Sequence, residues 1–313
     1  MSGPEGHGVP PRAPALVLRG RTVGAHAPAV MAIVNRTADS FYRGARQLDD
    51  GVALRAVEAA VEEGAEIVDV GGVRAGTGPV VDVSEEIRRT VPFVERLRAE
   101  FPDLLVSVDT WRSEVAREVV GAGADLLNDT WAGHDPGLVE VAGELGVGVV
   151  CSHTGGAVPR TDPVQVAYPL PDDAPPGSDP RDGVVLDVVA TLTRSAGRAE
   201  ECGVPRSSVL VDPTHDFGKS TWHSLHLTRS TARLSSLGYP LLMALSRKDF
   251  VGESLDLPAE DRLEGTLGAT AVAAWLGATV FRTHDVRATR RLLDMVAVLR
   301  GDLPAARVLR GLE

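Results

Sequence analysis

Eight short runs rich in β-branched residues alternate with segments in which apolar residues recur every three to four positions. The runs occupy residues 29–35, 66–72, 104–110, 125–130, 147–153, 208–213, 240–248 and 279–285. Helical spacing is clearest at 51–63, 84–100, 113–121, 136–145, 183–201 and 262–277. Strands that alternate with helices in this way form a parallel sheet. Eight such units in 313 residues predict a single-domain α/β protein, a closed (β/α)8 TIM barrel.

A doubly wound open sheet is the main alternative fold. No Gly-x-Gly-x-x-Gly motif follows the first run, which disfavours that alternative. Several helical segments end in a glycine just before the next run, as helices commonly do. Apolar residues make up 43% of the chain but aromatic residues only 4%, so the core should consist mainly of aliphatic side chains. Such a core suits parallel strands that are buried on both faces.

The chain divides into one folded domain and two short flanking segments. Residues 1–15 are rich in Pro and Gly and are expected to form a disordered extension. The barrel should span residues 16–302, and residues 303–313 should form a tail. Residues 156–182 carry seven prolines and cannot be helical, so we expect a long loop after the fifth strand. A plain insertion and a functional lid both remain open for this loop.

Charge and targeting signals exclude some classes of partner. The net charge is −11 without a basic block, which disfavours nucleic acid and anionic membranes as partners. The first residues lack the pattern of a signal peptide. The apolar stretch 269–281 is interrupted and shorter than the roughly 18 residues of a membrane span. Cys151 and Cys202 are expected to be free thiols, and a cytoplasmic location is expected.

Every predicted strand carries polar or ionisable residues at or near its carboxyl end. In chain order these are Asn35, Asp69, Asp109, Asn128 with Asp129, His153, Asp212, Arg247 with Lys248, and Arg282 with His284. Any one of them could simply be a solvated strand end or a helix cap, as Asp109 before Thr-x-x-Ser could be. Because barrel loops gather at the carboxyl ends of the strands, the whole set predicts one shared pocket.

The composition of this pocket indicates the kind of ligand. Carboxylates and amides can hydrogen-bond the edge of a heterocycle that carries N–H donors. Arg282 and His284 are two residues apart on a strand and could hold one anion together, while Lys248 adds a third cationic donor. The chain has no paired Cys/His metal spacing. Asn35 together with a phosphate of the substrate could hold Mg²⁺, but a metal-free site fits the residues equally well.

Several motifs, in this order along the chain, resemble those of the dihydropteroate synthase family. They are Met31-Ala-Ile-Val-Asn-Arg-Thr-Ala-Asp-Ser-Phe, Asp69-Val-Gly-Gly, Ser107-Val-Asp-Thr, Leu127-Asn-Asp, Asp212-Pro with Phe217-Gly-Lys, Ser246-Arg-Lys and Arg282-Thr-His-Asp. The likeness runs from about residue 16 to 300. The resemblance implies condensation of a hydroxymethyl-dihydropterin pyrophosphate with 4-aminobenzoate in folate biosynthesis.

The resemblance also implies roles for individual residues. Asp109, Asn128, Asp212 and Lys248 would bind the pterin ring, and Asp69 would lie deeper and support them. The remaining roles concern the anion and the second substrate. Asn35, Arg282 and His284 would hold the pyrophosphate with Mg²⁺, Asp39 would stabilise the cationic pterin methylene, and Phe217 and Lys219 would line the aminobenzoate side. The catalytic groups would be Asp39, Lys248, Arg282 and His284.

The chain departs from the family pattern mainly on its loops. Residues 71–78 read Gly-Gly-Val-Arg-Ala-Gly-Thr-Gly, whereas the family usually has Gly-Gly-Glu-Ser-Thr-Arg-Pro-Gly. Asp212-Pro is followed by Thr-His-Asp in place of Gly-Ile-Gly, and Asp249 stands where Ser is usual. Arg36, Ala38 and Thr154 also differ from the usual residues. These departures resemble those of the divergent second synthase-like paralogue of actinobacteria.

Three functional hypotheses remain open. The first is an active synthase, and the second is an inactive or repurposed paralogue that keeps a pterin and anion pocket. The third is a corrinoid-linked pterin methyltransferase, which would need neither Lys248 nor the Arg-x-His pair. A purely structural barrel would not explain the polar strand ends. Residues 265–278 are small and apolar almost all round, and the resemblance implies a homodimer through the last helices.

Overall fold

A computed structural model describes residues 8–35, 50–161, 166–172, 174 and 176–310. Eight parallel strands form one sheet in the order β8-β7-β6-β5-β4-β3-β10-β9. Their bounds are β3 Ala29–Asn35, β4 Ile67–Gly71, β5 Leu105–Asp109, β6 Leu126–Asp129, β7 Gly148–Ser152, β8 Val209–Asp212, β9 Leu242–Met243 and β10 Val280–Thr283. A parallel bridge between Val211 and Leu241 joins the two ends of this sheet. The predicted (β/α)8 barrel and its eight strands are therefore confirmed.

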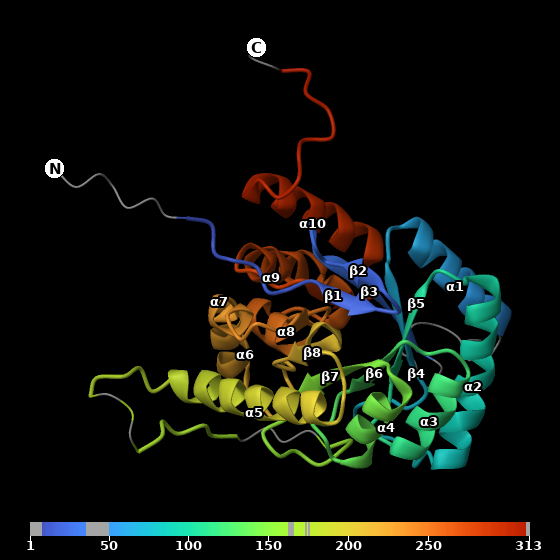
Figure 1. Cartoon of the computed structure of the whole chain (residues 1–313). Coiled ribbons are helices and arrows are strands. Elements are labelled where there is room, and N and C mark those ends of the chain that lie inside the picture. The colour runs from blue at the N-terminus through green and yellow to red at the C-terminus, as the bar shows by residue number, and fades with distance from the viewer. Residues whose placement is uncertain (1–7, 36–49, 162–165, 173, 175, 311–313) are drawn as a thin grey trace.

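Helices surround the barrel on its outer side (Figure 1). They are α1 Asp50–Glu62, α2 Val83–Glu100, α3 Ser113–Gly121, α4 Gly137–Leu145, α5 Asp182–Glu201, α6 Thr221–Arg229, α7 Thr231–Ser235, α8 Asp249–Leu255, α9 Leu263–Trp275 and α10 Val286–Arg300. The six helical segments expected from apolar spacing are present as α1 to α5 and α9. The sequence reasoning did not specify α6, α7, α8 and α10.

A β-hairpin closes the amino-terminal end of the barrel. Its strands are β1 Leu16–Leu18 and β2 Arg21–Val23, which pair antiparallel. Leu16 and Leu18 are buried in one cluster with apolar residues from the first half of the barrel strands, such as Ile67 and Leu105. Because the hairpin fills this end with apolar side chains, the polar strand residues are left for the opposite, carboxyl-terminal end.

Part of the amino-terminal segment packs against the last two helices. The Ala13 N–H donates to the Gly277 carbonyl (2.9 Å), and the Ala13 side chain is buried. The Arg300 guanidinium donates to the Pro10 carbonyl (2.8 Å). This part of residues 1–15 therefore differs from the disordered extension that we expected. At the other end, α10 stops at Arg300, and residues 304–310 are exposed.

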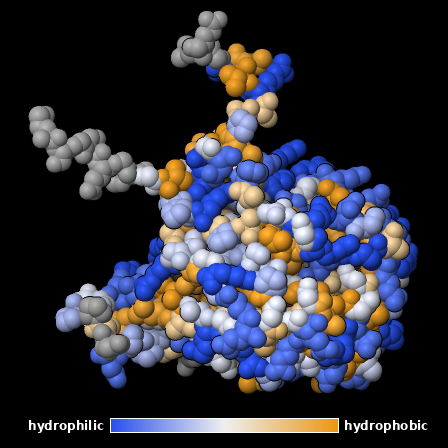
Figure 2. Space-filling model, in the orientation of Figure 1, coloured by the Kyte–Doolittle hydropathy of each residue, from blue (hydrophilic) through white to orange (hydrophobic). Residues whose placement is uncertain are grey.

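The outer surface mixes residues of different polarity. On the face shown in Figure 2, hydrophilic and hydrophobic residues are interspersed in small patches. Among the described residues, no helix has the length and apolar character required to cross a bilayer. Cys151 and Cys202 are both free thiols, as expected.

Candidate functional site

Asp69 is the centre of a polar network inside the barrel. It lies in the middle of β4 and is fully buried. Its carboxylate accepts hydrogen bonds from the Ser107 hydroxyl (2.6 Å) and the Asn128 amide nitrogen (3.1 Å). It also forms an ion pair with Arg282 (Nε to Oδ2, 2.6 Å). Three other strands therefore hold this carboxylate, and the carboxylate in turn orients Asn128 and Arg282.

Asp109 lies above this centre at the end of β5. Its carboxyl group accepts a hydrogen bond from the Thr130 hydroxyl (2.7 Å) and lies 3.4 Å from Arg282 Nη2. Burial, reinforced by the charge of Asp69, raises the pKa of Asp109 to about 7. Near neutral pH, Asp109 can thus serve a ligand either as a hydrogen-bond acceptor or, when protonated, as a donor.

Asp212 and Lys248 lie close together on the other side of the barrel. Burial raises the pKa of the Asp212 carboxyl and lowers the pKa of the Lys248 ammonium, and the opposite charge of each group limits the other's shift. Lys248 Nζ donates to the His215 carbonyl (2.6 Å) and lies 4.4 Å from the centroid of the Phe217 ring. A carboxylate, an ammonium group and an aromatic face are thereby presented together.

Lys219 is bonded to the backbone of two loops. Its side chain is buried, and its Nζ donates to the carbonyls of His153 (2.7 Å), Thr214 (3.0 Å) and Phe217 (2.9 Å). An ammonium group has three donors, so the backbone uses all of them. Lys219 therefore ties the loops after β7 and β8 together and presents no donor to an aminobenzoate.

The loop after β8 keeps a backbone conformation that favours glycine, although two of its residues are not glycine. Thr214 has a φ of 53° and Asp216 a φ of 70°, both in the left-handed region. The Thr214 N–H donates to Asp212 Oδ1 (2.7 Å), and the Thr214 hydroxyl accepts from the His153 N–H (3.2 Å). These hydrogen bonds hold Thr214 in the left-handed conformation, at a position where the family usually has glycine.

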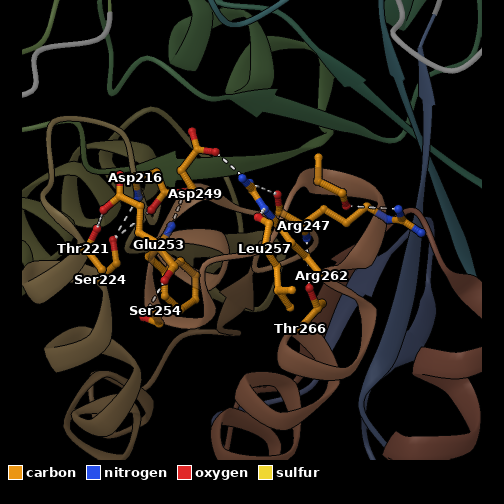
Figure 3. A network of polar contacts seen from close by, with 12 residues as sticks. Asp216, Thr221, Ser224, Arg247, Asp249, Glu253, Ser254, Leu257, Arg262 and Thr266 are labelled. Carbon is orange, nitrogen blue, oxygen red and sulfur yellow. Dashed lines mark hydrogen bonds and ion pairs between the residues drawn. The ribbon is translucent and has the colours of Figure 1, made fainter.

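Asp216 connects this loop to the start of α8 (Figure 3). Its Oδ2 accepts hydrogen bonds from the N–H groups of Asp249 (2.6 Å) and Phe250 (3.4 Å), and its Oδ1 accepts from the Ser224 hydroxyl (3.2 Å). Asp249 in turn pairs with Arg262 (2.7 Å). The two acidic residues that depart from the family pattern therefore belong to one network beside Lys248.

The residues expected to hold the anion have separate partners. Arg282 lies on β10 and points inward to the two carboxylates, whereas His284 is exposed and its Nδ1 lies 3.1 Å from the Ser246 hydroxyl. His284 lies one residue beyond the end of β10 at Thr283. Asn35 ends β3, opposite Gly71 in the ladder. Asp39 lies outside the described residues, as do Arg36 and Ala38.

The described residues fit a magnesium ion only in part. No group of three or more His, Cys, Asp or Glu side chains with metal-ligand geometry occurs among them. Asn35 supplies one amide oxygen next to Gly71, where an added Cβ would lie 3.5 Å from Asn35 Oδ1. Such a site suits a cation that retains water and takes oxygens from a bound phosphate, as Mg²⁺ does.

The second barrel loop, residues 71–78, departs from the family sequence and contacts the Pro-rich insertion. The Arg160 guanidinium donates to the Pro79 carbonyl (2.8 Å) and the Gly76 carbonyl (3.4 Å). Val73 from the second loop belongs to a buried apolar cluster with Trp111 and Trp131. Its other members are Val81 and the partly buried Ala75, Ala157 and Phe217. Trp131 lies edge-on to Phe217, with 5.2 Å between ring centroids. The two segments that depart most from the family pattern are therefore held together at the mouth of the barrel.

Of the Pro-rich loop predicted at residues 156–182, the described residues up to 181 are not helical, whereas α5 already begins at Asp182; the loop lies at the carboxyl-terminal end of the barrel. The Tyr168 hydroxyl donates to the Gly218 carbonyl (2.6 Å). A cavity of about 600 Å³, lined in part by Trp131, Tyr168 and Asp187, lies beneath this segment. Tyr168 thus anchors the insertion to the loop after β8, while another part of the segment extends away from the barrel before α5 (Figure 1).

The barrel is closed, and one of its ends carries linked carboxylates, an amide and a guanidinium. Such an arrangement is typical of barrel proteins that bind a small heterocyclic ligand at the carboxyl ends of the strands. Comparison with known proteins specifies the class. The family model described as pterin binding enzyme matches residues 31–284. The chain therefore belongs to this family, and it is a protein of the dihydropteroate synthase type.

The relatives include proteins of two kinds. The chain is 55% identical to a Mycobacterium leprae protein named inactive dihydropteroate synthase 2, over 95% of this chain and 99% of that protein. It is 34% identical to the dihydropteroate synthase of Bacillus subtilis, over 85% and 87% of the two chains. A solved structure of the Xanthomonas albilineans synthase with 4-aminobenzoic acid is 35% identical, with a TM-score of 0.78, over 93% of this chain and 100% of that one.

Sequence reasoning missed several residues that shape the site. Ser107 and Thr130 were quoted in or beside motifs, but their hydrogen bonds to Asp69 and Asp109 depend on the register of neighbouring strands. Arg160 gave no signal, because its two carbonyl partners lie more than eighty residues earlier in the chain. The hydrogen bonds of Asp216 to the start of α8 were indicated in the sequence only by the departure of this residue from the family pattern.

Proposed function

We propose that this protein binds a pterin that carries a pyrophosphate group and that its condensation with 4-aminobenzoate is weak or lost. The main support for pterin binding is the buried network of Asp69, Asn128, Asp109 and Arg282. A buried, oriented set of acceptors matches the N–H donors along the edge of a pterin ring. Asp212 and Lys248 would complete the contacts to the ring from the opposite side.

The pyrophosphate would lie toward the mouth of the barrel. Arg282, His284 and Asn35 stand at neighbouring strand ends, since β10 pairs with β3. A guanidinium is well suited to phosphate oxygens. Mg²⁺, held by Asn35 and the pyrophosphate, would stabilise negative charge on the leaving group. Asp39, which follows β3 in the sequence, is proposed to stabilise the pterin methylene, as the family resemblance implies.

Two features support impaired transfer to 4-aminobenzoate. Relatives with 54% and 55% identity over nearly the whole chain are named inactive dihydropteroate synthase 2. In addition, the second loop lacks Glu-Ser-Thr-Arg-Pro and is held by Arg160. An active synthase is the second candidate, and it is supported by the presence of Asp109, Asn128, Asp212 and Lys248. No described feature favours a corrinoid-linked methyltransferase.

Calorimetric titration with the pterin pyrophosphate and Mg²⁺ is expected to show binding, and addition of 4-aminobenzoate is expected to release little pyrophosphate. Asp212→Asn should weaken binding about 10- to 100-fold, because it removes a buried charged acceptor worth roughly 1.5–3 kcal/mol. Asp82→Asn, at the cap of α2, should leave binding unchanged. Absence of binding would refute the pterin pocket, and rapid release of pyrophosphate would establish an active synthase.

We further propose that the protein is a homodimer through α9 and α10, which lie side by side (Figure 1). Val272 and Trp275 on α9 and Met295 and Leu299 on α10 are exposed apolar residues. Contiguous exposed apolar residues favour association. Sedimentation at micromolar concentration should give a dimer, and Leu299→Glu should shift it toward monomer. A wild-type monomer would contradict this proposal.

A further inference from the structure

Acidic residues follow and precede the residues near Phe217, and such negative charge is unexpected in a site that binds a carboxylate ligand. Asp216 immediately precedes Phe217, and its carboxylate occupies the N–H groups of Asp249 and Phe250. Asp249 adds a second carboxylate, whose side chain is 72% exposed. The charges of both acidic groups act on Lys248, which lies over the Phe217 ring.

The cations near these carboxylates are already engaged. Lys219 donates all three of its N–H bonds to backbone carbonyls. Arg262 pairs with Asp249 (2.7 Å), and Arg247 forms a two-point pair with Asp285 (2.9 and 2.8 Å). Lys248 keeps donor capacity beyond its bond to the His215 carbonyl, but Asp212 and Asp216 already compete for its charge. A ligand carboxylate at this place would meet like charges, which is unfavourable.

The same surroundings suit an uncharged aromatic ligand with N–H donors. Phe217 and Trp131 form an aromatic wall, with ring centroids 5.2 Å apart and planes at 71°. A flat ring can pack against such a wall. The carboxylates around Lys248, which lies over Phe217, can accept hydrogen bonds from amine or amide groups. Charge and shape at this place therefore both favour a neutral amine over an anionic one.

We propose that Asp216 determines which second ligand binds beside Phe217. It would exclude aromatic amines that carry a carboxylate and admit uncharged aromatic amines. This inference rests on the proposed function, because it assigns the second ligand of the same barrel. Asp216 is a specificity-determining residue here and is not assigned a catalytic step.

The test compares 4-aminobenzamide with 4-aminobenzoate as matched neutral and anionic probes. Dissociation constants would be measured by ligand-observed NMR and calorimetry at about pH 8, because burial raises the pKa of Asp216 and a higher pH favours its ionised form. They would be measured with and without the pterin pyrophosphate and Mg²⁺. The wild type should bind the amide at least about 10-fold more tightly than the acid.

Asp216→Asn is the informative variant, because asparagine tolerates the left-handed φ of 70° and its carbonyl can still accept from the Asp249 N–H. It should bring the two dissociation constants within about threefold of each other, and Asp216→Gly should do the same or reverse the preference. Asp82→Asn is a control that removes a helix-capping carboxylate elsewhere, and it should keep the wild-type ratio.

Equal binding of the two probes by the wild type, an unchanged ratio in Asp216→Asn, or no binding of either probe to any variant would overturn the inference. Failure of the proposed function gives a different result. In that case the pterin pyrophosphate does not bind, while the ratio of the two probes still depends on Asp216.

Discussion

Asp69→Asn is expected to lower the free energy of unfolding by about 3–5 kcal/mol, because it removes the nearer of the two carboxylates that neutralise the largely buried Arg282. Arg282 Nε lies 2.6 Å from the Asp69 carboxylate, which is fully buried. Asparagine has nearly the shape of aspartate, so loss of packing contributes little. Urea unfolding monitored by circular dichroism would measure the change.

Ser107→Ala is the matched control for this variant. It removes one hydrogen bond to the same carboxylate and leaves the ion pair in place, so it should cost about 1.5 kcal/mol, at the lower end for a bond to a charged group. If Asp69→Asn were no more destabilising than Ser107→Ala, the ion pair would contribute no more than the single hydrogen bond from Ser107. Arg282 would then have to be stabilised by Asp109 alone.

Most of the barrel could be predicted because its strands and helices produce strong periodic signals. All eight runs of β-branched residues became barrel strands, and β3 matched its predicted bounds of 29–35. The hairpin of β1 and β2 was missed because three-residue strands are too short to show an alternation. The helix α8 was missed for a similar reason, since its seven residues make up fewer than two turns.

The site could be predicted in outline but not in its internal pairing. The barrel rule places strand ends together, and it brought Asp69, Asp109, Asn128 and Arg282 into one network. It cannot say which groups neutralise one another. The network of Asp216 with α8 depends on contacts between two loops, and such contacts are not encoded by local periodicity. The positions of the loops therefore had to come from the structure.

The stability of Asp109→Asn relative to the wild type is expected to depend on pH. Burial, reinforced by Asp69, raises the pKa of Asp109 from 3.8 to about 7. Between these two values the folded protein holds a proton that the unfolded chain has released. Wild-type stability should therefore fall as pH rises through this window, by at most about 1.4 kcal/mol per pH unit from this group. The asparagine side chain cannot ionise, so the variant lacks this contribution.

The measurement is the difference in free energy of unfolding between Asp109→Asn and the wild type from about pH 5 to pH 8. The difference should shift in favour of the variant by up to about 3 kcal/mol as pH rises, and level off above about pH 7. Asp82 offers a control, because a hydrogen bond from the Glu85 N–H lowers its pKa and places its titration below this range. Asp82→Asn should therefore run parallel to the wild type. A parallel Asp109→Asn curve would mean that Asp109 is ionised throughout, and that Arg282 compensates its charge more fully than its distance of 3.4 Å indicates.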